Sequence, residues 1–301
     1  MSAGSQMLET PRGRFHLRRW GDRASSPLLL FAHATGMCAG LYEALLAPLA
    51  DRARIVAFDA RGHGRTVAGD TGEPLADWQP FQEDMASLVA ALGEGPVLLA
   101  GHSFGATVAL EAAVGHPGIA SAVLMVEPAF IPFAHAEAYR ALRAAGGHPP
   151  NPMAERAARR RAQFASPDEM REAWRGRGVF AGWPGRALEA YLEGAVIADA
   201  SGARLACTPA WEAAVFRGVS TTLEASLRAA RLPVTLVRGT EGSTVTPDDA
   251  AAIAAMGHRV AVLEGAGHFV PIEAPGRVGP FLEALLGQAA APVPQPRRAE
   301  R

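Results

Sequence analysis

A serine stands between two glycines where an apolar run ends, in residues 99–107, LAGHSFGAT. Ser103 has Gly101 two positions before it and Gly105 two positions after it. This G-x-S-x-G spacing is typical of a sharp strand-to-helix turn, because larger side chains at the glycine positions would clash with the neighbouring backbone. A serine hydroxyl is a weak nucleophile near neutral pH. It needs an imidazole to take its proton and a carboxylate to orient that imidazole.

Candidates for these partners follow other apolar runs of the chain. His268 closes the loop Gly-Ala-Gly-His after the last run, and Glu127 directly follows the run that ends at Val126. Glu241 lies on the loop after a later run and is the alternative acid. Asp249 stands three residues after Thr246 with a proline between them, which is typical of a helix start, so we interpret Asp249 as a capping residue.

Short apolar runs that alternate with helical patterns must position these side chains. The runs predict strands, and the patterns between them predict helices. Strands are expected over 28–32, 55–58, 96–100, 122–126, 234–237 and 260–263, and helices over 41–49, 81–92, 106–114, 247–256 and 278–286. This alternation predicts a mostly parallel, doubly wound α/β sheet covered on both faces. Ligands of such sheets bind beyond the carboxyl ends of the strands, where the serine, the histidine and both glutamates are expected.

The motif GHSFG is accompanied by FAHATG, FDARGHGRT and EGAGHFVPIEAP, and together they resemble the α/β-hydrolase family over residues 26–130 and 232–287. The resemblance implies that Ser103 is the nucleophile and His268 the general base. It also implies that the backbone N–H groups of Thr35 and Phe104 bind the oxyanion. His33, His102, Asp59 and His63 are expected to support the surrounding loops.

The acid departs from the commonest pattern of that family. Many members carry an aspartate three or four residues after the glycine that ends the penultimate strand, but this chain has Gly242 and Ser243 there. Some members, including many haloalkane dehalogenases, resemble this chain in placing an acid where Glu127 stands. The resemblance therefore favours Glu127, with Glu241 as the alternative.

Residues 131–231 interrupt the alternation and show no convincing strand. We expect an all-helical cap over the serine, inserted into a hydrolase core formed by 1–130 and 232–287. The basic cluster at 156–161 is expected to form a solvated helix face. The expected apolar walls of the substrate pocket are Met37, Phe130, Phe133, Trp183 and Phe269.

Composition excludes several classes of function. The 301 residues are 49% hydrophobic and carry a formal net charge of −1, which gives no reason to expect nucleic acid or an anionic membrane as partner. All 29 basic residues are arginines, so no lysine can form a Schiff base or bind phosphate in a P-loop. We expect two free thiols, Cys38 and Cys207, in a cytoplasmic protein, and a disordered tail over 288–301.

The expected function is that of a serine hydrolase. It would cleave a carboxylester or lactone of a small to medium hydrophobic substrate through an acyl-enzyme, with no metal or organic cofactor. A carbon–carbon bond hydrolase or a cofactor-free perhydrolase would use the same three residues. The non-enzyme alternative is a small-ligand receptor of the same fold, which the fold alone does not exclude.

Overall fold

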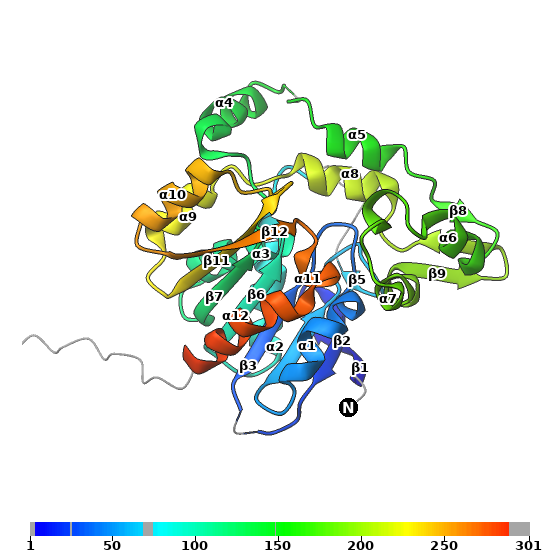
Figure 1. Ribbon diagram of the computed structural model, residues 1–301, viewed down its shortest axis with the longest axis horizontal. Helices are drawn as coiled ribbons and strands as arrows, with labels where there is room; N and C mark the ends of the chain where they lie inside the picture. The colour runs from blue at the N-terminus through cyan, green and yellow to red at the C-terminus, as the bar shows by residue number, and fades with distance from the viewer. Residues whose placement is uncertain (1–3, 25, 69–74, 148, 289–301) are drawn as a thin grey trace, which may run out of the picture.

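A mostly parallel sheet forms the centre of the computed structural model, which describes residues 4–24, 26–68, 75–147 and 149–288 (Figure 1). Its strand order is β1-β2-β4-β3-β6-β7-β11-β12, with β5 paired to β2. The strands from β4 to β12 in this order pair in parallel, whereas β2 pairs antiparallel with its neighbours. Their bounds are β1 Gly4–Thr10, β2 Gly13–Trp20, β3 Leu28–Ala32, β4 Arg54–Phe58, β5 Val67–Ala68, β6 Val97–His102, β7 Ala120–Val126, β11 Val234–Glu241 and β12 Arg259–Gly267.

All six predicted strands are present, which confirms the α/β fold class. The sequence analysis missed the antiparallel hairpin β1–β2. In β2, which lies between β1 and β4, the buried residues Phe15 and Leu17 alternate with polar residues, so this antiparallel strand lacks the continuous apolar run of a central parallel strand. The predicted tail lies outside the described residues, except that Gln288 ends the last helix.

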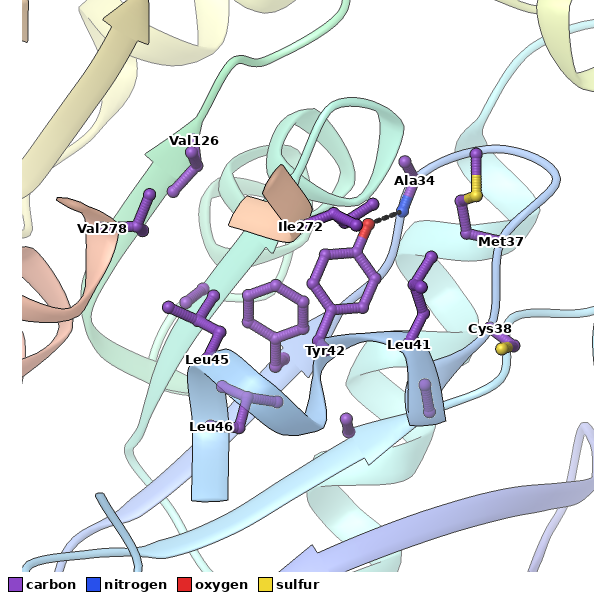
Figure 2. Close-up of a cluster of buried hydrophobic side chains, with 14 of the residues drawn as sticks. Ala34, Met37, Cys38, Leu41, Tyr42, Leu45, Leu46, Val126, Ile272 and Val278 are labelled. Carbon is purple, nitrogen blue, oxygen red and sulfur yellow. Dashed lines mark hydrogen bonds between the residues drawn. The ribbon is translucent and has the colours of Figure 1, made fainter. Parts of the chain in front are cut away.

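Helices cover both faces of the sheet. Side chains alternate between the two faces along each strand, and those of the central strands are apolar, so both faces must be shielded from water. In β3, Leu29 and Phe31 face one hydrophobic cluster, whereas Leu28 and Leu30 face the other. Figure 2 shows the first cluster around Tyr42. The helices of the core are η1 Ala39–Tyr42, α1 Glu43–Leu46, η2 Ala47–Leu49, α2 Gln79–Ala91, α3 Phe104–Gly115, α10 Pro247–Ala255, α11 Val270–Glu273 and α12 Pro275–Gln288.

The segment between β7 and β11 is not all-helical, which corrects the prediction for the cap. Strands β8, β10 and β9 form a small antiparallel sheet within it. These strands are two to four residues long, too short to give a periodic signal. The elements are α4 Phe133–Ala144, α5 Pro152–Ala158, β8 Gln163–Phe164, α6 Pro167–Trp174, η3 Gly178–Phe180, α7 Gly185–Ala195, β9 Val196–Asp199, β10 Gly202–Leu205, α8 Pro209–Arg217 and α9 Leu223–Ala229.

The last helix of this segment, α9, packs against the core helix α3, with Leu223 and Leu227 buried in the second hydrophobic cluster. The two cysteines, Cys38 and Cys207, are free and buried. Within the described ranges, no helix is both long enough and apolar enough to cross a membrane.

Candidate active site

Ser103 lies at a tight turn between β6 and α3. Its backbone has a φ of 55° and a ψ of −122°, a region that costs a non-glycine residue energy. A β-carbon added at Gly101 would lie 2.4 Å from the Gly105 carbonyl group, and one added at Gly105 would lie 2.4 Å from the Ala32 carbonyl oxygen. Both glycines are therefore required by close backbone approach, which explains their spacing around the serine.

The structure brings the predicted nucleophile, base and preferred acid together. His268 Nε2 lies 3.1 Å from Ser103 Oγ, and His268 Nδ1 lies 3.1 Å from Glu127 Oε2. Both distances are within hydrogen-bond reach. The Ser103 N–H also donates to the Val126 carbonyl at 2.9 Å, so the ends of β6 and β7 are tied together at the site.

The Glu127 carboxylate is fully buried and accepts several hydrogen bonds. The Gly239 N–H and the Ser243 hydroxyl, 2.8 Å away, donate to Oε1, while the Thr244 N–H donates to Oε2 at 3.1 Å. Burial opposes ionisation, but the hydrogen bonds from His268, Gly239 and Ser243 outweigh it and lower the pKa of Glu127 to about 2. The carboxylate is therefore charged at neutral pH. Ser243, which stands where the commonest family pattern has an aspartate, and the neighbouring Thr244 instead donate hydrogen bonds to this acid.

The other two acids lie elsewhere. Glu241 is exposed at the end of β11, and no hydrogen bond among the described residues joins it to His268. Asp249 is buried at the start of α10, where its N–H donates to the Thr246 hydroxyl oxygen at 3.0 Å. Its carboxylate accepts from the Phe133 N–H at 3.0 Å, so Asp249 also holds the start of α4.

The two predicted oxyanion donors lie on adjacent backbone segments. Phe104 is the first residue of α3, where a helix has no internal acceptor for the N–H group. On the loop after β3, the Ala34 N–H donates to Tyr42 Oη at 3.1 Å and the Gly36 N–H donates to His63 Nε2 at 3.0 Å. No hydrogen bond from the intervening Thr35 N–H is found within the described part of the chain. The loop thus leaves this donor available between two anchored neighbours.

His63 can anchor the loop because it remains neutral. Its Nδ1 lies 3.0 Å from the Arg61 carbonyl oxygen, which can only accept, so Nδ1 carries the proton and Nε2 is free to accept. Burial and the neighbouring His33 lower the pKa of His63 to about 3. The supporting role expected for His63 therefore takes a specific form, a hydrogen bond to the residue after Thr35.

The five predicted pocket residues divide between the two hydrophobic clusters. Met37, Trp183 and Phe269 belong to the first hydrophobic cluster, where the Phe269 ring lies 5.1 Å from His268 and 6.0 Å from Trp183. Phe130 and Phe133 pack against each other at 5.2 Å in the second cluster. The Trp183 indole nitrogen is buried without a partner in the part of the chain that the structure describes.

One arginine of the basic cluster is not on a solvated helix face, contrary to prediction. Arg160 lies beyond the end of α5 and binds the buried Glu212 at 2.6 Å. Its Nη2 also lies 3.4 Å from the hydroxyl of Tyr191, which donates to the Gly36 carbonyl at 3.2 Å. Arg160 and Glu212 are 52 positions apart, so no local pattern could have paired them. This network links the cap to the loop that carries Thr35.

Thr244 and Ser243 are further site residues that the sequence analysis did not assign. Both precede the helix start at Thr246, and no residue pattern distinguishes them from ordinary turn residues. Among the described residues, no group of three or more His, Cys, Asp or Glu side chains could hold a metal ion.

Comparison with known proteins agrees with this geometry. The model of the alpha/beta hydrolase family matches residues 29–279. The chain is 29% identical over 257 residues to a 2-(acetamidomethylene)succinate hydrolase of Mesorhizobium japonicum, covering 83% of this chain and 84% of that protein. A crystal structure of E-2-(acetamidomethylene)succinate hydrolase has a TM-score of 0.77 at 24% identity, covering 95% of this chain and 99% of that one.

A second solved structure, the enol-lactonase from Burkholderia xenovorans, has a TM-score of 0.66 at 18% identity, covering 94% of this chain and all of that one. At these identities the two structures establish a common fold. The family match extends from β3 into α12 and includes both the serine turn and the His268 loop. This chain therefore belongs to the α/β hydrolase family.

Proposed function

We propose that this protein hydrolyses an acyl bond, in the first place a carboxylester or lactone, through a covalent acyl-serine intermediate. Ser103 Oγ attacks the substrate carbonyl carbon while His268 Nε2 takes the serine proton. Glu127 holds the proton on His268 Nδ1 and stabilises the imidazolium that forms. The N–H groups of Thr35 and Phe104 bind the negative oxygen of the tetrahedral intermediate.

Each later step uses the same groups. The imidazolium returns its proton to the leaving alcohol as the bond to the carbonyl carbon breaks, which leaves an ester on Ser103. His268 then takes a proton from water, and the resulting hydroxide attacks this ester. As the second tetrahedral intermediate collapses, the imidazolium returns this proton to Ser103 Oγ, which releases the acid and restores the serine hydroxyl.

The contact that carries this proposal is the continuous link from Ser103 Oγ through His268 to the ionised Glu127. The nucleophile at this turn is a serine, and a serine that attacks a carbonyl carbon forms an acyl ester. The surrounding aromatic residues Trp183 and Phe269 favour a small to medium apolar acyl group.

A fluorophosphonate probe tests the mechanism. We expect it to label Ser103 alone among the serines, as shown by peptide mapping, because the Ser103 hydroxyl stands at the strained turn with His268 Nε2 3.1 Å away to take its proton. Ser103→Ala should abolish both labelling and hydrolysis of p-nitrophenyl butyrate. Labelling of another serine in active wild-type protein, or esterase activity that survives Ser103→Ala, would contradict the proposal.

A second candidate function is cleavage of an amide bond in an acidic substrate. One relative is named for hydrolysis of an acetamido derivative of succinate. The observation that favours this candidate is the guanidinium of Arg160, which approaches the loop that carries Thr35. A β-carbon added at Gly36 would lie 3.7 Å from Arg160 Nη1. The ion pair with Glu212 already balances this charge, which keeps the neutral ester as the first choice.

Matched substrates distinguish the two candidates. A p-nitrophenyl ester and the corresponding anilide, each carrying either a butyryl or a succinyl group, separate bond type from charge. The first candidate predicts the highest kcat/KM for the butyryl ester. The second predicts faster turnover of the succinyl compounds and a loss of that preference in Arg160→Gln.

A further inference from the structure

A chain of three hydrogen bonds, two of them buried and the third partly buried, joins the loop that carries Thr35 to the backbone of His268. The Ala34 N–H donates to Tyr42 Oη at 3.1 Å, as Figure 2 shows. The same hydroxyl lies 2.7 Å from His102 Nδ1, and His102 Nε2 lies 2.8 Å from the His268 carbonyl oxygen. Tyr42 and His102 are both fully buried. We call Tyr42 and His102 the relay pair.

The protons of the relay pair can be placed from their partners. The carbonyl of His268 can only accept, so His102 Nε2 must carry the ring proton. Burial and the neighbouring His268 lower the pKa of His102 to about 3, so its Nδ1 has no proton and accepts from Tyr42. Burial raises the pKa of Tyr42, which keeps its hydroxyl protonated. Every hydrogen bond therefore runs in one direction, from the Ala34 N–H to the His268 carbonyl.

Both ends of this chain adjoin groups that the proposed mechanism needs. Ala34 directly precedes Thr35, the proposed oxyanion donor. The other end fixes the peptide of His268, whose ring bonds Ser103 and Glu127. The centroid of the His102 ring lies 5.0 Å from that of the His268 ring. His102 also directly precedes Ser103 in the chain. Tyr42 thus bonds the oxyanion loop, His102 bonds the histidine that serves as base, and the two side chains bond each other.

From this geometry we infer that Tyr42 and His102 are positioning residues, which hold the Thr35 N–H and the His268 imidazole in register around the reacting carbonyl. This inference rests on the proposed function. An oxyanion donor acts on the transition state only if its distance to the developing charge is fixed before reaction. The relay pair sets that distance relative to the base, because it connects their two backbone segments through two fully buried side chains that are hydrogen-bonded to each other.

Tyr42→Phe tests the inference because it removes one oxygen and leaves the packing of the ring unchanged. We expect kcat for p-nitrophenyl acetate to fall about 10-fold with KM nearly constant, since the loss affects the transition state alone. An alkyl trifluoromethyl ketone forms a negatively charged adduct with the serine, so its affinity should weaken by a similar factor. The matching methyl ketone, which carries no such charge, should bind as before.

Two further variants separate positioning from general destabilisation. Thr107→Val removes another buried hydroxyl, which donates to the Ala129 carbonyl at 2.8 Å, and should lower the Tm without changing the ratio of the two ketone affinities. His102→Gln should reduce kcat, and adding Tyr42→Phe to it should cost little more, because both changes break one chain. If His102→Gln does not fold, the kcat and the two ketone affinities of Tyr42→Phe alone test the positioning role.

The outcomes are distinguishable from those of the proposed function. Wild-type protein that forms no adduct at Ser103 overturns the proposed function and the role of the relay pair with it. Wild-type protein that reacts at Ser103, while Tyr42→Phe retains full kcat or weakens both ketones equally, overturns the positioning role alone.

Discussion

The ends of the core strands and the cap hold their residues by different means. At the strand ends, backbone groups contact backbone groups: the Ser103 N–H binds the Val126 carbonyl, and the Glu127 N–H binds the Val237 carbonyl. Around Phe180 in the cap, side chains contact side chains. Trp174 stacks on Phe180 at 5.1 Å, and Phe180 packs edge-on against Trp183 at 4.9 Å.

The two kinds of contact differ in how they respond to substitution. A substitution cannot move a backbone contact without moving a strand, so the strand ends tolerate few changes. A contact between two side chains can be replaced by another of similar volume at a modest cost. We therefore expect the reaction type to depend on the core and the choice of substrate to depend on the cap.

Substitution of the acid Glu127 is expected to have the largest effect on kcat. Glu127→Gln should lower kcat by roughly 10²- to 10⁴-fold, because an amide cannot stabilise the imidazolium of His268. Glu241→Gln, the matched change at the alternative acid, should have little effect because Glu241 is exposed. Steady-state kinetics on p-nitrophenyl butyrate measure both variants. The opposite ranking would assign the role to Glu241.

The same carboxylate should make stability depend on pH. Its pKa falls from an ordinary 4.5 to about 2 on folding, so the folded state is favoured above pH 4.5 and this contribution is lost as the pH falls toward 2. The contribution is about 3 kcal/mol, at about 1.4 kcal/mol for each pH unit between the two pKa values. Urea unfolding at pH 5 and pH 3 should show a smaller loss of stability in Glu127→Gln than in wild type. Equal losses would contradict this assignment.

A glycine substitution tests the rigidity of the strand ends. Gly101→Ala should lower the free energy of unfolding by about 1–3 kcal/mol, because its new β-carbon would meet the Gly105 backbone at 2.4 Å. Gly115→Ala is the matched control at the end of α3, where an added β-carbon meets nothing within 4 Å. Chemical denaturation measures both changes. Similar stability of the two variants would show that the serine turn can relax.

The smallest effect on chemistry is expected in the cap. Trp183→Ala should alter the preference among acetate, butyrate and octanoate esters by about 1–3 kcal/mol while preserving turnover of the acetate, because only a remote apolar contact is lost. Trp174→Ala is the control, since Trp174 packs within the cap against Phe180 and Tyr191. An equal fractional loss on all three esters would show that Trp183 supports folding of the cap rather than selectivity.

The same difference explains which parts could be predicted from sequence. The core strands are continuous apolar runs, and the turn around Ser103 needs glycines at fixed spacing, so local patterns identify both. The family resemblance favours Glu127, because some members carry an acid at this place directly after the strand, with Glu241 as the alternative. The pairing of Arg160 with Glu212 and the hydrogen bond from Tyr42 to His102 depend on contacts between distant segments, which no local pattern encodes. In the sequence Tyr42 looks like an ordinary core aromatic residue, because its ring does pack in the hydrophobic core. Only its hydroxyl group bonds His102.

The adjacency of β6 and β7 also affects how the site is assembled during synthesis. Ser103 and Glu127 arrive on neighbouring strands, whereas His268 follows Glu127 by 141 residues. At about 5–20 residues per second, the ribosome needs roughly 7 to 28 s to make that interval. Through this period the nascent chain has a nucleophile and an acid but no base. Two donors to the Glu127 carboxylate, Gly239 in β11 and Ser243 after it, are made only 29 and 25 residues before His268. Under the proposed function, the emerging chain is therefore inert toward acyl compounds until His268 has been made.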